Sequence, residues 1–321
     1  MRRSKFEIYK PTVTRLKNKN PMKKIIIGSR GSDLALWQAH FTQNALTAAG
    51  AKTEIKIIKT QGDKIQNLSF DKMEGKGFFT KEIEAALHEG SIDIAVHSHK
   101  DLETTNPEGL TVAAVSHRED PADLLVIRKN CVDKKQVFRL KDKPVVGTSS
   151  ARRKAQFLHF RPDTKIDDIR GNVPTRLQKL RDGKFDAILL AAAGVKRLGI
   201  DMSEFEVHKM HVKTFVPAPA QGVLGIQIRK DDDKLYRLVN SVMNRVEVAR
   251  CIKIEREVLR RFQGGCQMPL GVYCEKEFTG NFAIYAAYAK TWNSRVHFTK
   301  VATPVEEFAV DMVMKSLLRE G

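Results

Sequence analysis

The residues with the clearest chemical potential lie in the segment Gly264-Gly265-Cys266-Gln267-Met268-Pro269-Leu270-Gly271. Cys266 follows two glycines and precedes a proline, so its backbone is suited neither to a helix nor to the interior of a strand. This pattern predicts a thiol on an exposed turn. A cysteine can equally be a small buried side chain near the end of a helix, which is the commoner role for an isolated cysteine. The other polar motifs of the chain favour the chemical role.

Several turns between an expected strand and an expected helix carry arginine beside small polar residues. Free backbone N–H groups at helix N-termini attract anions, and the planar guanidinium binds a carboxylate through two hydrogen bonds. The residues are Arg30 with Ser32, Thr148 and Ser150 with Arg152 and Arg153, and Arg170 with Arg176. A single arginine is more often a solvated surface residue. Three such sets together predict a site for several carboxylates or phosphates.

A lone carboxylate, Asp101, ends the segment His97-Ser98-His99-Lys100-Asp101, which follows an expected strand. In doubly wound sheets, ligands bind outside the carboxyl ends of strands. Asp101 could be an ordinary turn residue, but in a cationic cleft it would stay ionised and stabilise a cation formed during a reaction. His97 and His99 would face one side of a strand. The sequence offers no third and fourth ligand, so we expect no metal site.

Composition narrows the classes of partner. The 321-residue chain has 56 Lys and Arg against 38 Asp and Glu, a formal charge of +18, which fits nucleic acid, an anionic membrane or an acidic small molecule. With 7% aromatic residues and no recognised binding motif, nucleic acid is disfavoured. No apolar run could span a membrane and no signal peptide is apparent, so we expect a cytoplasmic protein without a membrane partner. The four cysteines are too irregularly spaced for a disulfide framework or a zinc site.

Short apolar strands alternate with helices along most of the chain, which is typical of a doubly wound α/β sheet. We expect strands at residues 23–28, 53–58, 92–96, 145–146, 165–169, 185–190 and 223–228, and helices that begin near residues 32, 80, 151 and 172. The stretch 61–77 is long for a connection and predicts a mobile lid. One long helical region is expected at 235–262. Strands at 270–274, 282–289 and 296–301 and a last helix at 304–318 predict a small α+β domain.

Six motifs follow one another along the chain: residues 28–38 (GSRGSDLALWQ), 75–79 (GKGFF), 95–101 (AVHSHKD), 147–153 (GTSSARR), 170–172 (RGN) and 264–271 (GGCQMPLG). This ordered series closely resembles the porphobilinogen deaminase family, and the resemblance runs from about residue 23 to the C-terminus. The resemblance implies two doubly wound α/β domains similar to periplasmic binding proteins, with a small C-terminal α+β domain. The implied domains are 22–118 with 217–240, 119–216 and 241–321, after a flexible basic extension at 1–21.

The resemblance also implies an activity. A member of this family is a transferase that condenses four porphobilinogen molecules head to tail, with loss of ammonia, and releases the linear tetrapyrrole hydroxymethylbilane in haem biosynthesis. Cys266 would carry a dipyrromethane cofactor through a thioether, and Asp101 would stabilise the cation left when ammonia departs. Cofactor contacts are implied for Arg152, Arg153, Ser150, Thr148, Lys100, Ser98, Arg170 and Gly171. Substrate contacts are implied for Arg30, Ser32, Arg170, Arg176, Arg197, Lys76 and Phe79. Nothing in the sequence demands an oligomer, so we expect a monomer.

Two positions depart from the family pattern. Asp33 replaces a usual proline, and Leu102-Glu103 replaces a usual Val-Pro, so each change adds negative charge near an anion site. The chief alternative is a non-enzymatic anion-binding protein of the same two-domain architecture, because a fold does not fix a function. Cys266 favours the enzyme, since a binding module has no need of a thiol in this turn.

Overall fold

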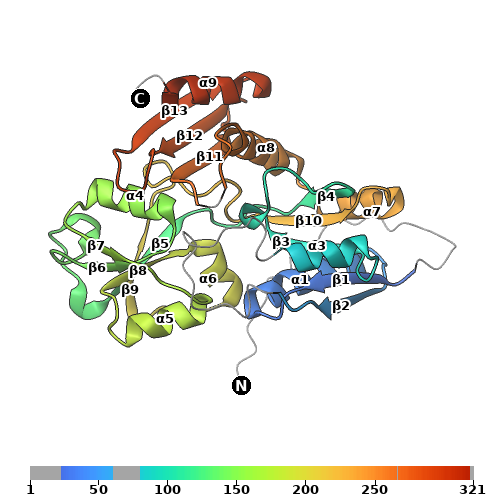
Figure 1. Ribbon diagram of the computed structural model, residues 1–321, viewed down its shortest axis with the longest axis horizontal. Helices are drawn as coiled ribbons and strands as arrows, with labels where there is room; N and C mark the ends of the chain where they lie inside the picture. The colour runs from blue at the N-terminus through green and yellow to red at the C-terminus, as the bar shows by residue number, and fades with distance from the viewer. Residues whose placement is uncertain (1–22, 61–79, 266, 319–321) are drawn as a thin grey trace.

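Three lobes, each built on its own β-sheet, make up the molecule (Figure 1). The computed structural model describes residues 23–60, 80–265 and 267–318. The expected lid at 61–77, the extension at 1–21, and the predicted site residues Lys76, Phe79 and Cys266 lie outside the described residues.

The first lobe holds a five-stranded mixed sheet. Its strand order is β2 (Thr53–Ile57), β1 (Ile25–Ser29), β3 (Ile94–Ser98), β10 (Leu224–Arg229) and β4 (Leu110–Val115). Strands β2, β1 and β3 are parallel, and β10 runs antiparallel to both of its neighbours. The sheet packs against α1 (Asp33–Ala48), α3 (Lys81–His88) and α7 (Asp233–Met243). Helices on both faces explain why the inner strands β1 and β3 begin with continuous apolar runs.

The second lobe repeats this plan. Its order is β7 (Lys165–Asp167), β6 (Val145–Gly147), β8 (Ala187–Ala191), β5 (Asp123–Arg128) and β9 (Phe205–Lys209). Here β5 is the antiparallel strand that corresponds to β10. The helices are α4 (Ala151–Phe160), α5 (Val173–Arg181) and α6 (Ala192–Leu198). The two sheets confirm the doubly wound prediction, although β4, β5 and β9 were not predicted from the sequence.

The chain crosses between these lobes twice, once from β4 to β5 and once from β9 to β10. The two crossings lie side by side, because Ser116 N donates to Leu224 O and Glu119 N donates to Gly222 O, both at 3.0 Å. Gly222 has a positive φ of 89°, and a Cβ at this position would lie 2.3 Å from the Glu119 carbonyl oxygen. Glycine is therefore required for the crossings to approach each other.

The third lobe is the predicted small α+β domain. Strands β11 (Leu270–Lys276), β12 (Phe282–Tyr288) and β13 (His297–Thr303) form an antiparallel sheet that packs against α8 (Val246–Arg261) and α9 (Glu306–Leu318). Residues of β12 also pack against the second lobe, where Tyr285 and Ala287 share one buried apolar cluster with Ala155 of α4. The ring of Phe298 in β13 lies 5.0 Å from that of His159. The third lobe therefore rests on helix α4.

The prediction of one helical region at 235–262 was wrong, because α7 and α8 are separate helices. The break is at Asn244, whose backbone is extended (φ −72°, ψ 132°). Its Oδ1 accepts a hydrogen bond from Val115 N at 3.1 Å, and Arg245 N donates to Val115 O at 3.0 Å. The break thus fastens the chain to β4 before it enters the third lobe. Neither α7 nor α8, nor any other helix in the described part of the chain, is long and apolar enough to cross a membrane.

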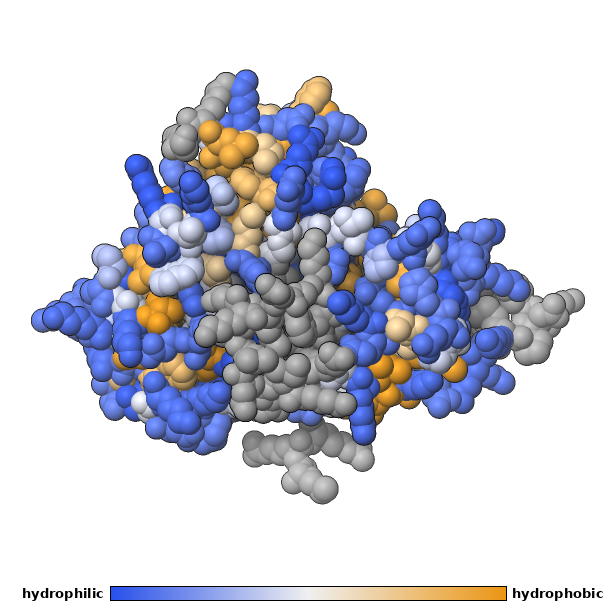
Figure 2. Space-filling view, in the orientation of Figure 1, coloured by the Kyte–Doolittle hydropathy of each residue, from blue (hydrophilic) through white to orange (hydrophobic). Residues whose placement is uncertain are grey.

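Hydrophilic side chains cover most of the visible face of the first and second lobes, whereas apolar side chains gather more on the third lobe (Figure 2). A formal charge of +18 on a surface of this kind attracts anionic ligands over a distance.

A buried carboxylate lies where the three lobes meet. Glu255 of α8 is 0% exposed. It accepts hydrogen bonds from Arg118 Nη1 at 2.6 Å, from Ala220 N at 2.7 Å and from Cys274 N at 2.8 Å. These donors belong to the first crossing, the second crossing and β11. One side chain therefore ties both crossings to the third lobe.

We predict that Glu255→Ala lowers the free energy of unfolding by about 3–5 kcal/mol, because the substitution leaves a buried guanidinium and two buried amides without their acceptor. Urea denaturation followed by circular dichroism measures the loss. Glu257→Ala on the same helix is the control, since its carboxylate pairs with Arg260 and Arg261 at the surface and should contribute about 1 kcal/mol or less. Equal losses in the two variants would contradict the prediction.

Candidate active site

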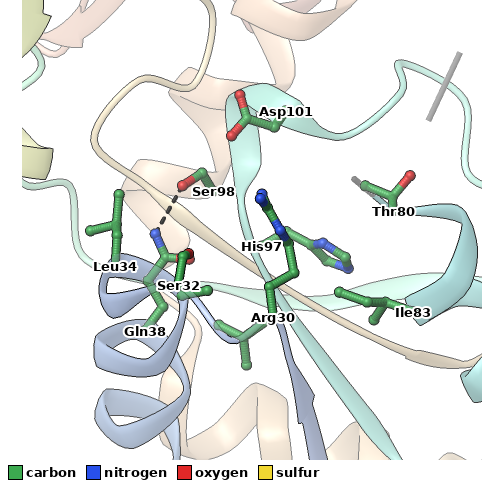
Figure 3. A pocket seen from close by; sticks show the side chains of 11 residues that line it. Arg30, Ser32, Leu34, Gln38, Thr80, Ile83, His97, Ser98 and Asp101 are labelled. Atoms are coloured by element: carbon green, nitrogen blue, oxygen red, sulfur yellow. Dashed lines mark hydrogen bonds between the residues drawn. The ribbon is translucent and has the colours of Figure 1, made fainter. Parts of the chain in front are cut away.

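A cavity of about 100 Å³ lies at the carboxyl ends of β1 and β3 (Figure 3). Its polar lining includes Arg30 and Ser32 from the β1–α1 turn, Gln38 from α1, and Ser98 and Asp101 from the end of β3. Helix α1 begins at this cavity and α3 borders it on the other side. Four residues predicted from separate motifs are thus brought together where ligands bind in doubly wound sheets.

The turn that carries Asp101 is held by the third lobe. Strand β3 ends at Ser98, and a single 3₁₀ turn covers His99–Asp101. Arg256 of α8 donates to the carbonyl oxygens of His99 at 3.0 Å and Leu102 at 3.2 Å, and it also binds the carbonyl of Glu103. Leu102 is buried and Asp101 is exposed. The backbone of the catalytic candidate is therefore fixed while its carboxylate remains accessible.

The two histidines beside Asp101 are buried and neutral at physiological pH. His97 Nε2 lies 3.1 Å from Gln227 Oε1. Burial lowers the pKa of His97 to about 4. Burial and the nearby Arg256 cation lower the pKa of His99 to about 3. Within residues 23–60, 80–265 and 267–318, no group of three His, Cys, Asp or Glu side chains is arranged to hold a metal ion.

In the second lobe, the turn from β6 to α4 places two predicted arginines against a buried carboxylate. Arg152 Nη1 donates to Asp123 Oδ2 at 2.7 Å, and Arg153 Nη2 donates to Asp123 Oδ1 at 2.6 Å. Asp123 is 0% exposed. Although burial alone would raise the pKa of Asp123, the two guanidinium groups hold it well below its ordinary value. Ser150 caps α4 by accepting a hydrogen bond from Arg153 N, and Thr148 is buried just before it.

Helix α5 and the turn before it contribute a second set of cations, Arg176 and Arg170. Burial and the positive charges of Arg153 and Arg170 together lower the pKa of Arg176 to about 10, and the charge of Asp101 opposes the shift. Groups from both lobes are therefore close enough to act on one another. Cations crowded in this way are stabilised by a ligand that carries several negative charges. The residues present thus fit a polycarboxylate.

The start of α5 is built as the sequence predicts. Asn172 is the N-cap, and its Oδ1 accepts a hydrogen bond from Thr175 N at 2.9 Å. Gly171 has a positive φ of 109°, and a Cβ at this position would lie 2.6 Å from a Thr175 side-chain atom. Its carbonyl accepts a hydrogen bond from Arg176 Nε at 2.8 Å. The glycine therefore lets the chain turn and orients the arginine.

Arg197 belongs to α6, and its side chain packs against α1 and does not line the cavity. Its Nη2 donates to Gly222 O at 2.7 Å, and its guanidinium lies over the Trp37 ring at 5.6 Å. Burial lowers its pKa to about 10. The structure does not group Arg197 with the residues around Asp101, and its contact with the second crossing explains its burial.

Comparison with known proteins agrees with this geometry. Residues 25–237 match the family model of the dipyrromethane cofactor-binding domain of porphobilinogen deaminase, and residues 249–311 match the model of its C-terminal domain. The chain belongs to the porphobilinogen deaminase family. Porphobilinogen deaminase of Nitratiruptor sp. is 40% identical over 93% of this chain and 97% of that protein. The protein of that name from Chlorobium phaeobacteroides is 45% identical over 82% of each chain.

Family membership makes this chain an enzyme of tetrapyrrole biosynthesis and assigns the cofactor-binding domain to its first two lobes. Among solved structures, the Bordetella pertussis BvgS periplasmic VFT2 domain covers 73% of this chain and 93% of that chain, with 13% identity and a TM-score of 0.41.

Two polar residues of the site, Gln38 and Asp123, were not predicted from the sequence. Gln38 lines the cavity, and its Nε2 donates to Ser98 Oγ at 2.9 Å. It lies in the motif at 28–38, four positions after Leu34. A glutamine on an otherwise apolar helix face could have indicated a residue of the site. Asp123 gave no local signal, because its partners lie 29 and 30 residues away.

The two depressed histidine pKa values predict that the protein loses stability as the pH falls. Unfolded histidines take up protons near pH 6.5, whereas His97 and His99 do so only near 4 and 3. Between pH 7 and pH 5, each should remove about 2 kcal/mol from the free energy of unfolding. Urea denaturation at both pH values measures the loss. In the His97→Gln/His99→Gln variant the loss should be smaller, and an identical pH dependence would contradict the prediction.

Proposed function

We propose that this chain condenses four porphobilinogen molecules head to tail, with loss of ammonia at each step, and releases hydroxymethylbilane. The dipyrromethane cofactor would be joined to Cys266 by a thioether. The observation that supports this proposal most directly is the grouping of Asp101 with Arg153, Arg170 and Arg176 across the first two lobes. One exposed carboxylate among several fixed cations suits a reaction in which a polyanionic chain grows through cationic intermediates.

Asp101 is the catalytic residue of this proposal. Its carboxylate faces the cavity from a turn fixed by Arg256. As ammonia leaves porphobilinogen, positive charge develops on the pyrrole, and a prepositioned anion lowers the energy of that transition state. Lys100 lies beside Asp101, and burial lowers the pKa of its ammonium group. The charge of Asp101 opposes that shift and so favours the charged form of Lys100.

The cations bind the carboxylates of substrate and product. Each porphobilinogen carries two carboxylates, so every addition increases the negative charge of the bound chain. Arg30 and Ser32 lie at the cavity and bind the incoming unit. Arg153, Arg170 and Arg176 bind the growing chain. When bound, the dipyrromethane would supply the terminal pyrrole to which the first unit is joined, and each added unit would become the terminal pyrrole for the next.

We also propose that the enzyme works as a cytoplasmic monomer without nucleic-acid or membrane partners, because one chain supplies every group named above. The domain boundaries implied by the resemblance, at 22–118 with 217–240, 119–216 and 241–321, are part of the same proposal. The positions of the two crossings support the boundaries after residues 118 and 216. The boundary at 240 falls inside α7, three residues before that helix ends.

The covalent cofactor predicts a measurable mass. Intact-mass spectrometry of the purified chain should show an excess equal to two linked pyrrole units, and Cys266→Ser should lack it. Cys131→Ser is the matched control, because Cys131 is buried in the core of the second lobe and should leave the excess unchanged. An unmodified chain with full activity would show that the cofactor assignment is wrong.

The role of Asp101 predicts a selective loss of turnover. Asp101→Ala should lower kcat by at least about 100-fold, because the anion that stabilises the developing cation is gone. Its melting temperature should stay unchanged, since the side chain is exposed. Glu108→Ala removes an exposed carboxylate that follows the same turn and should keep normal turnover. Near-normal activity of Asp101→Ala would overturn the assignment.

A further inference from the structure

A buried chain of polar contacts joins the Asp101 turn to helix α4. Lys100 Nζ donates to Gln221 Oε1 at 3.2 Å, and Gln221 Nε2 donates to Asp123 Oδ1 at 2.9 Å. Asp123 in turn accepts hydrogen bonds from Arg152 and Arg153. Gln221 and Asp123 are both 0% exposed. The chain of contacts therefore runs through the interior from one lobe to the other.

The two central residues sit on the two crossings. Asp123 is the first residue of β5 and Gln221 lies shortly before β10. Gln221 Nε2 also donates to Pro121 O at 2.7 Å, and Arg118 Nε donates to Gln221 O at 3.1 Å. The amide is thus held by both its side chain and its backbone. A movement of one crossing against the other would break several of these bonds at once.

An amide is the side chain that fits between these neighbours. Its oxygen accepts from a cation, Lys100, while its nitrogen donates to an anion, Asp123. A carboxylate at position 221 would face the Asp123 carboxylate, and an apolar side chain would satisfy neither neighbour. Buried polar groups left without partners are costly. Glutamine at this position therefore satisfies both neighbours, Lys100 and Asp123.

We propose that Gln221 and Asp123 are positioning residues for the reaction, which hold the Asp101 turn of the first lobe at a fixed place relative to the arginines of α4. This inference rests on the proposed function and deepens it. The network touches Lys100, beside the catalytic carboxylate, and Arg153, one of the arginines that hold the growing chain. It does not touch Arg30 or Ser32, which bind the incoming unit. The two residues therefore act on turnover and leave capture of the incoming unit unaffected.

The test is steady-state kinetics on the purified holoenzyme, with intact mass as the check on cofactor loading. Gln221→Leu and Asp123→Asn should each lower kcat by about tenfold or more, while KM for porphobilinogen changes by less than about threefold. Gln221→Leu leaves the ion pairs of Asp123 in place. It therefore tests the role of the network even if Asp123→Asn folds poorly. The double variant should be no slower than the slower single variant, because both changes interrupt one network.

Asp186→Asn is the matched control. Asp186 is also a buried carboxylate of the second sheet, and it binds Arg128 and Lys141. It precedes β8, whereas Asp123 pairs with the last residue of that strand, so the two lie at opposite ends of the sheet. Asp186→Asn should lower the melting temperature without changing kcat.

Four results would overturn the inference. The first two are a kcat for Gln221→Leu within twofold of the wild type and a loss of kcat in Asp186→Asn equal to that in Asp123→Asn. The other two are multiplicative losses in the double variant and a rise in KM with kcat intact. Wild-type consumption of porphobilinogen in the same assay tests the proposed function separately, and without it both proposals fall.

Discussion

Burial of the Asp123 carboxylate between Arg152 and Arg153 is the interaction on which the site depends. Guanidinium groups repel one another, and without a fixed anion they would turn away from a common site before any ligand arrived. Asp123 holds two of them in place in the free protein. It balances only one of their two charges, so the cluster that includes Arg170 and Arg176 keeps an excess of positive charge for a ligand. Preorganised charge of this kind needs no rearrangement when substrate binds.

The two doubly wound lobes share one plan in which each sheet receives an antiparallel strand, β5 or β10, directly after a crossing. This exchange explains why the crossings run side by side and why polar residues at their ends can link the lobes. The third lobe strengthens the arrangement from two directions. Its sheet rests on α4, and Arg256 from α8 holds the turn that carries Asp101. The parts of the site on the first and second lobes therefore both contact the third lobe.

Local features of this structure could be predicted from the sequence, whereas contacts between distant segments could not. The strand that ends before Asp101 and the Asn172 cap depend on periodicity and on side chains a few residues apart, so they were predicted correctly. The break at Asn244 depends on Val115, which is 129 residues away. The contacts of Gln221 with Lys100 and Asp123 span 121 and 98 residues. The family motifs supplied most of the site residues that we propose, but they carried no information about the buried groups behind them.

The crowded cations around Arg176 also bear on product length. In the proposed reaction, each unit added to the bound chain brings two carboxylates, and the first of these relieve the mutual repulsion that adds to burial in lowering the Arg176 pKa. Later carboxylates meet guanidinium groups that are already neutralised, so each further unit gains less attraction than the one before. A site with a fixed number of arginines thus approaches charge saturation as the chain grows. Electrostatics alone therefore limits the number of units that the site can bind.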